Sequence, residues 1–254
     1  MKYKKPLIAL TFALLLVSAL ICFLYAFKTA DVEVTVTKTE ISDSSVEDGV
    51  LNSLSSLKGK CLPFLSESKI IEAAKSGSPY AEVVSVKKSY PNKIVVSIKE
   101  RVETFFISSG ENSVMTDENF HVLRVTKENA NRLDGNRNVE IILNPTDVKE
   151  GSFAVGATVT VNDGETAETL KTLVPLLHQN RKTVKSASVA VRENGVFFRS
   201  VSLTFLEGAK FELALAYERT ADKFNAAKQK YESLTDKSAG EFIVSVKDGA
   251  ISIV

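Results

Sequence analysis

The chain has 254 residues, of which 44% are hydrophobic and 25% are charged. This composition is typical of globular proteins and excludes a wholly disordered or fibrous chain. The 32 basic residues nearly balance the 31 acidic residues, and beyond residue 28 there are 28 basic against 31 acidic. Charge therefore favours no strongly basic surface, and we expect no nucleic-acid partner.

An apolar run without any charged side chain occupies residues 6–27. As a helix it would rise about 33 Å, enough to cross a hydrocarbon core of about 30 Å. Lys2, Lys4 and Lys5 precede it. The positive-inside bias thus predicts a cytoplasmic tail over residues 1–5, a single-pass transmembrane helix, and the remaining chain outside the cell membrane. A cleaved signal peptide is the alternative, although its apolar core is typically only about 7 to 15 residues.

Residues 31–37 alternate between valine and polar residues, which predicts a half-buried strand. Two helices are predicted next. Ser44 and Glu47 have capping-box spacing ahead of apolar residues at helical intervals. Ser66 is placed to cap a second, shorter helix that Gly77 would end.

Two further strands are predicted over residues 82–88 and 93–100, where apolar and polar residues again alternate. Tyr90, Pro91 and Asn92 lie between them and have the chemistry of a tight turn. The first part of the folded chain therefore has the predicted order β-α-α-β-β.

The remaining chain is predicted to be mostly antiparallel strands with two helices. Strands are expected over residues 104–107, 114–116, 122–125, 139–143, 186–191, 196–206 and 210–215. Helices are expected over residues 165–177, with a break or kink near Pro175, and over residues 219–234. A final hairpin is expected from strands 242–246 and 250–254, joined by a type I′ turn at Asp248 and Gly249. The fold class is α+β.

No cofactor, metal site or small-molecule substrate is predicted. His121 and His178 are the only histidines, and neither stands at a metal-ligand spacing. The segment GSFAVG at residues 151–156 lacks the lysine of a phosphate-binding loop. An enzyme would need a serine activated by a neutral lysine, as in membrane-anchored serine-lysine peptidases. The closest segment, residues 113–116, has no diagnostic motif, so we expect no enzymatic activity.

One stretch carries a resemblance to a known family. Residues 81–101 read AEVVSVKKSYPNKIVVSIKER. Together with the apolar amino-terminal span and the β-α-α-β-β order, this stretch resembles the FtsQ/DivIB family of bacterial cell-division proteins. The resemblance implies a POTRA domain over residues 31–101 and a β domain over residues 102–254 that ends in a carboxyl-terminal hairpin. One departure is that Asn119 and Phe120 stand at the end of a turn where the family usually has glycine. Asn119 tolerates a positive φ.

The resemblance also implies a function and a site. It implies a non-enzymatic scaffold at the division septum that binds FtsL-like and FtsB/DivIC-like membrane proteins and helps to assemble and regulate septal peptidoglycan synthesis. An exposed sheet edge would add a partner strand. By position, the partner-binding residues are Val244, Val246, Asp248, Gly249, Ile251 and Ile253. The alternatives are ordinary core and turn residues at these positions, an anchored serine-lysine peptidase, or a secreted POTRA adaptor.

Overall fold

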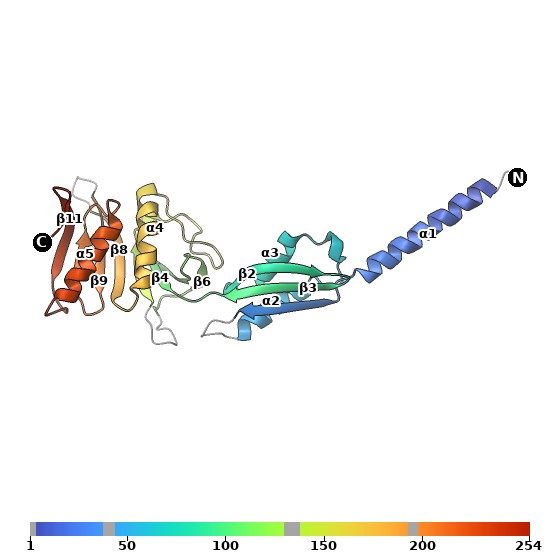
Figure 1. The fold of residues 1–254 in the computed structure, drawn as a ribbon, viewed down its shortest axis with the longest axis horizontal. Coiled ribbons are helices and arrows are strands. Elements are labelled where there is room, and N and C mark those ends of the chain that lie inside the picture. The colour runs from blue at the N-terminus through green and yellow to red at the C-terminus, as the bar shows by residue number, and fades with distance from the viewer. Residues whose placement is uncertain (1–3, 38–43, 130–137, 193–197) are drawn as a thin grey trace. The chain divides into compact units, whose positions relative to one another are not determined.

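The computed structural model describes residues 4–37, 44–129, 138–192 and 198–254. These residues cluster into two compact units, Met1–Arg101 (unit 1) and Val102–Val254 (unit 2), and each is described by itself (Figure 1). Helices and strands are both present in each unit, in agreement with the predicted α+β class.

The first helix, α1 (Lys4–Ala26), contains the apolar run that the sequence predicts to cross a membrane. Such a span needs about 20 mostly apolar residues to cover a hydrocarbon core. In the part of the chain that the structure describes, no helix is both long and apolar enough for a membrane span. This finding overturns the predicted transmembrane helix over residues 6–27.

After α1, unit 1 has the order β-α-α-β-β that the sequence predicts. Its elements are β1 (Asp31–Thr37), α2 (Ser44–Ser55), the 3-10 turn η1 (Leu62–Phe64), α3 (Glu67–Gly77), β2 (Ala81–Ser89) and β3 (Lys93–Glu100). The three strands form one sheet in the order β1-β3-β2 (Figure 1). The central strand β3 runs parallel to β1 and antiparallel to β2.

The core of unit 1 forms between the apolar faces of its two helices and its sheet. Along β3 every second side chain is buried, while the intervening side chains are at least partly exposed. The helices contribute apolar side chains spaced by four residues, which places them on one helix face. The fully buried hydrophobic residues of this core are Val50, Leu54, Leu62, Ile70, Ala74, Ile94, Val96 and Ile98. Both helices therefore pack against the same side of the sheet.

Helices α2 and α3 approach one another closely at two glycines. A Cβ atom added to Gly77 would lie 2.5 Å from Gly49 O and 2.7 Å from Val50 Cα. A Cβ atom added to Gly49 would lie 2.6 Å from Gly77 O. Real side chains make essentially no contacts this short, so the two helices can pack at this distance only because both positions lack a side chain.

Unit 2 is built on one large sheet. Its elements are β4 (Phe105–Ser109), β5 (Asn112–Thr116), β6 (Val122–Val125), β7 (Val139–Leu143), the 3-10 turn η2 (Pro145–Asp147), α4 (Gly164–Gln179), β8 (Val184–Arg192), β9 (Phe198–Phe205), β10 (Lys210–Leu213), α5 (Thr220–Ser233), β11 (Glu241–Lys247) and β12 (Ala250–Ile253). The nine described strands lie in the order β12-β11-β10-β9-β8-β7-β4-β5-β6.

The sheet of unit 2 contains parallel pairs as well as the predicted antiparallel ones. Strand β7 is parallel to β4 and to β8, and β11 is parallel to β10. A parallel pair needs a long crossover connection, usually a helix. Helix α4 connects β7 to β8, and α5 connects β10 to β11. The two helices contact each other and cover the same face of the sheet (Figure 1).

The predicted break in α4 is absent. Pro175 lies inside the helix, which continues to Gln179. Proline removes one backbone donor, but the end of the helix is held by Asn180. The Asn180 side-chain amide donates to Leu176 O over 2.8 Å, and its backbone N–H donates to Leu176 O and Leu177 O. The first two residues of the strand predicted over residues 196–206 lie outside the described residues.

Candidate functional site

The terminal hairpin consists of β11 and β12, closed by Asp248 and Gly249. The φ angles of these two residues are 50° and 79°. A type I′ turn requires positive φ at both central positions, which glycine adopts freely and aspartate tolerates. The predicted turn type therefore agrees with the backbone conformation.

The six predicted partner-binding residues fall into two groups. Val244 pairs with Ile253, and Val246 pairs with Ile251, so these four side chains point to one face of the hairpin. Val244 is fully buried in the core of unit 2, and the two isoleucines pack against that core while partly exposed. Asp248 and Gly249 are exposed at the turn.

The backbone of β12 has one side free of any described strand, because the sheet ends at β12. Ile243 and Val254 exchange both hydrogen bonds, at 2.9 and 3.0 Å. In an antiparallel ladder the bonded pairs alternate with non-bonded pairs. Ile251 and Ile253 therefore lie at the non-bonded positions, where their N–H and C=O groups point away from β11. An extended segment could pair with these groups.

Two apolar residues on the other face of the hairpin were not predicted as site residues. The Ile243 side chain is 46% exposed, and Val254 is 82% exposed. Their backbones pair directly, so they lie side by side at the edge of the sheet. Strand alternation could have predicted this second face, because the odd-numbered residues of β11 must point to the face opposite Val244.

The opposite edge of the sheet, at β6, is partly occupied. The Val122 N–H donates to Ala157 O over 2.8 Å, and Val122 O accepts from the Gly156 N–H over 2.9 Å. One step earlier, the Val159 N–H donates to Phe120 O over 2.9 Å. Residues 156–159 therefore cover the beginning of this edge, which leaves β12 as the more accessible edge among the described strands.

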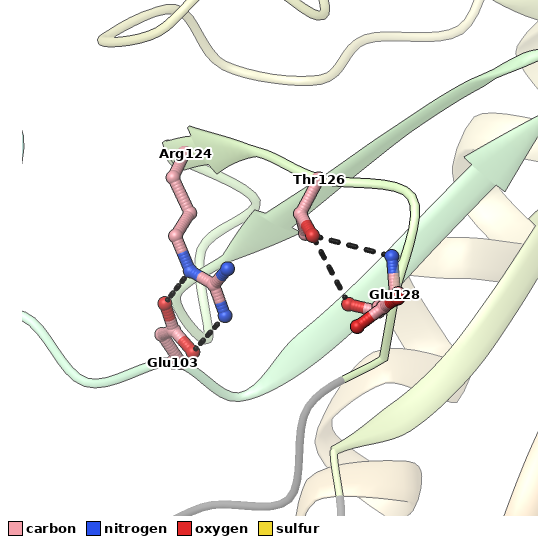
Figure 2. A network of polar contacts seen from close by, with 4 residues as sticks. All are labelled: Glu103, Arg124, Thr126 and Glu128. Carbon is pink, nitrogen blue, oxygen red and sulfur yellow. Dashed lines mark hydrogen bonds and ion pairs between the residues drawn. The ribbon is translucent and has the colours of Figure 1, made fainter.

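An ion pair also ties β6 to the segment that enters β4 (Figure 2). The Arg124 guanidinium binds the Glu103 carboxylate with two hydrogen bonds, Nε to Oε1 at 2.6 Å and Nη2 to Oε2 at 3.2 Å. Beyond β6, Thr126 and Glu128 close a local turn in which the Glu128 N–H donates to the Thr126 hydroxyl over 3.2 Å. A bidentate pair of this kind fixes side-chain direction. The β6 edge is thus held by side chains as well as by backbone contacts.

Two cations lie at the beginning of α5, next to the hairpin. Arg219, the N-cap residue, has a left-handed backbone with φ of 50°, and its guanidinium donates to Gly249 O over 2.8 Å. Lys223 is 1% exposed, and its ammonium donates to Ala214 O at 2.6 Å and to Leu215 O at 2.7 Å. Sequence analysis missed both residues, because neither has a local pattern that distinguishes it from a surface cation.

Burial lowers the pKa of the Lys223 ammonium below its usual value of 10.5. The negative charge of Glu218 opposes this shift, and the positive charge of Arg219 adds to it. When the folded pKa of a lysine lies below the unfolded pKa, the unfolded chain holds more protons in the interval between them. The free energy of unfolding then rises with pH across that interval.

We expect the stability of the wild-type chain relative to Lys223→Met to increase as the pH rises toward 10.5, the usual pKa of lysine. Methionine keeps most of the side-chain volume but cannot titrate, so the difference between the two chains isolates the Lys223 proton. Urea unfolding at several pH values measures that difference. Lys228→Met, at a partly exposed position of the same helix, is the control for the loss of a lysine charge. A difference for Lys223→Met that does not change with pH would contradict the prediction.

A groove of about 440 Å³ lies between α4 and the turn that precedes β6. Its residues are Glu118, Asn119, Phe120, Val159, Thr160, Val161, Ala167, Leu170, Lys171, Val174 and Pro175. Phe120, not Asn119, takes the positive φ in this turn, at 63°. The Asp117 carboxylate accepts from the N–H groups of Asn119 and His121, both at 2.9 Å, and so holds the turn. The Phe120 ring packs edge-on against Phe105.

The described residues hold no group of three or more histidine, cysteine, aspartate or glutamate side chains that could bind a metal ion. His178 Nδ1 lies 3.5 Å from Glu118 Oε2, and Arg181 approaches its other ring nitrogen at 3.3 Å. In the segment closest to a serine-lysine motif, the Ser113 hydroxyl donates to Thr126 O over 2.6 Å. Unit 2 thus has an open strand edge at β12, next to a hairpin turn whose Gly249 carbonyl accepts a hydrogen bond from Arg219.

These features define a class: an α+β protein with a β-α-α-β-β unit and a mixed-sheet unit that ends in an edge hairpin. No protein-family model matches the chain. The chain is 33% identical over 98 residues to the cell division protein DivIB of Clostridium acetobutylicum. The match covers 37% of this chain and 37% of that relative. The resemblance to the FtsQ/DivIB family is confirmed over this stretch.

Proposed function

We propose that the chain acts in bacterial cell division as a non-enzymatic scaffold that binds other division proteins through the edge of β12. The observation that carries the proposal is the open backbone of this edge, where the groups of Ile251 and Ile253 point away from the sheet. The similarity to DivIB supports the process in which the scaffold acts.

The partners in this proposal are FtsL-like and FtsB/DivIC-like proteins at the division septum. A segment of one partner would extend the sheet as a further strand, with backbone hydrogen bonds giving affinity and side chains giving specificity. The exposed Ile243 and Val254 offer apolar contact to that strand on one face. Holding these partners together would help to assemble and regulate septal peptidoglycan synthesis.

A partner strand needs the outward N–H groups of β12, and a proline removes one of them. We expect Ile253→Pro to weaken partner binding at least about tenfold, through the lost hydrogen bond and the steric block to pairing. Proline is tolerated on edge strands when its missing N–H faces solvent, so the hairpin should persist. Binding of a purified FtsB/DivIC-like protein to the full chain, followed by interferometry, measures the effect.

The matched control is Ile253→Ala, which also loses the partly buried side chain but keeps the N–H. Its binding should fall much less than that of Ile253→Pro, while both variants lose similar thermal stability. Equal binding by the two variants would refute strand addition at β12. No binding by the wild-type chain to FtsL-like or FtsB/DivIC-like proteins would refute the proposed partners.

A further inference from the structure

The beginning of α5 departs from the usual electrostatics of helices. Backbone N–H groups give the N-terminus of a helix a partial positive charge, so acidic residues are favoured there and basic residues are disfavoured. Here Arg219 is the N-cap and Lys223 lies in the first turns, with Asp222 as the acidic residue of the first turn. Two cations near the positive end of α5 lower the stability of the helix, so their other contacts must offset this cost.

Arg219 also adopts a backbone conformation that is unfavourable for its residue type. Its φ of 50° and ψ of 41° lie in the left-handed region, and its side chain makes no capping hydrogen bond to α5. Asparagine, aspartate and glycine occupy this region at lower cost. Unfavourable conformations of this kind persist where surrounding contacts hold them, often at functional positions.

Both cations bind backbone carbonyls of the segments that flank the hairpin. The Arg219 guanidinium bridges Asp222 Oδ2 and Gly249 O, each at 2.8 Å, so it joins the beginning of α5 to the hairpin turn. Lys223 holds the carbonyls of residues 214–215. The Ala214 N–H in turn donates to Val244 O of β11 over 3.0 Å.

The part of the hairpin beyond Val244 has few other anchors, because the ladder between β10 and β11 ends at the pair Leu213 and Val244. Val244 is the fully buried side chain of β11 and β12, and the remaining described side chains of both strands are at least partly exposed. At the other end of β11, the Lys210 ammonium lies 3.1 Å from Glu241 Oε1, in an exposed pair. Edge elements with little buried surface open locally at low free-energy cost.

We infer that Arg219 is a positioning residue: its bond to Gly249 O holds the β11–β12 turn against α5, so that the β12 edge is kept straight for an incoming strand. The role in partner binding rests on the proposed function. The bond between Arg219 and Gly249 O, here called the Arg219 clamp, is present in the chain without a partner. If the hairpin could accept a partner strand only part of the time, the apparent affinity for the partner would fall in proportion to the population of that state.

The test is Arg219→Asn in the full chain. Asparagine favours both the left-handed backbone and the N-cap position, and it removes a cation from the helix N-terminus. We expect a melting temperature equal to or above that of the wild type. Amide exchange of β11 and β12 should nevertheless accelerate, and binding of the FtsB/DivIC-like protein should weaken about tenfold. If Arg219 only stabilised the fold, its replacement would lower the melting temperature and accelerate amide exchange together.

Lys228→Asn is the control, because it removes the same charge from the same helix at a residue paired with Glu232. It should leave hairpin exchange and binding unchanged. Unchanged hairpin exchange in Arg219→Asn would overturn the clamp. Accelerated exchange with undiminished binding would overturn the positioning role. If the wild type binds no division partner, the proposed function fails, and the exchange comparison still decides whether the clamp exists.

Discussion

Gly77→Ala is expected to destabilise unit 1 by about 3 kcal/mol, at the upper end of the usual cost of overpacking. The new methyl group would lie 2.5 Å from Gly49 O and 2.7 Å from Val50 Cα. Both are backbone atoms, so no side chain can rotate away, and α2 and α3 would have to separate. Alanine is favoured over glycine inside helices by about 1 kcal/mol, and the overpacking cost exceeds this gain.

Gly164→Ala is the matched control for this substitution. Gly164 is the first residue of α4, and apart from its chain neighbours and the backbone of its own helix no heavy atom lies within 4 Å of a Cβ atom built there. Its unfolding free energy should change by less than about 0.5 kcal/mol. Urea unfolding followed by circular dichroism, with amide exchange to assign the loss to unit 1, measures both variants. Unchanged protection of α2 and α3 in Gly77→Ala would contradict the close helix contact.

Phe211→Ala is expected to destabilise unit 2 by about 3–5 kcal/mol, the usual cost of truncating a fully buried phenylalanine. The Phe211 ring stacks on Phe242 at a centroid distance of 4.8 Å and packs edge-on against Phe205 at 5.3 Å. Phe205 in turn stacks on Tyr231 of α5 at 4.2 Å. Phe211 therefore links β10, the hairpin strand β11 and the helix α5 across the parallel pair.

Tyr217→Ala provides the comparison within the same unit. Its side chain is 42% exposed, so its removal should cost less than about 1 kcal/mol. Thermal and urea unfolding of the two variants give the difference directly. A cost below about 2 kcal/mol for Phe211→Ala would show that the aromatic contacts do not hold β11 to the sheet.

Local periodicity predicted those elements whose burial alternates regularly. Strand β1 was predicted with the bounds that the structure has, and the order β-α-α-β-β followed from capping and turn residues. The final hairpin was predicted from Asp248 and Gly249, since few turn types accept this pair. These features depend on residues close in the sequence, which explains why they were accessible.

Features that depend on contacts distant in the sequence were not predicted. The parallel pairing of β10 with β11 joins residues about thirty positions apart, with register Lys210 to Glu241. The buried Lys223 ammonium is hydrogen-bonded to the carbonyls of residues 214–215, which lie on a different segment of the chain. The positive φ of Phe120 was assigned to Asn119 because residue type alone suggested it. The six partner-binding positions remain a prediction.

The four-residue length of β12 limits how the chain can associate with copies of itself. Open sheet edges also pair with copies of themselves, and natural proteins limit this by keeping edge strands short. Four residues offer few backbone hydrogen bonds to a second copy, so self-association should be weak at ordinary concentrations. If the proposed strand addition at β12 holds, edge-to-edge dimers formed at high concentration would occupy the same edge and compete with a partner strand.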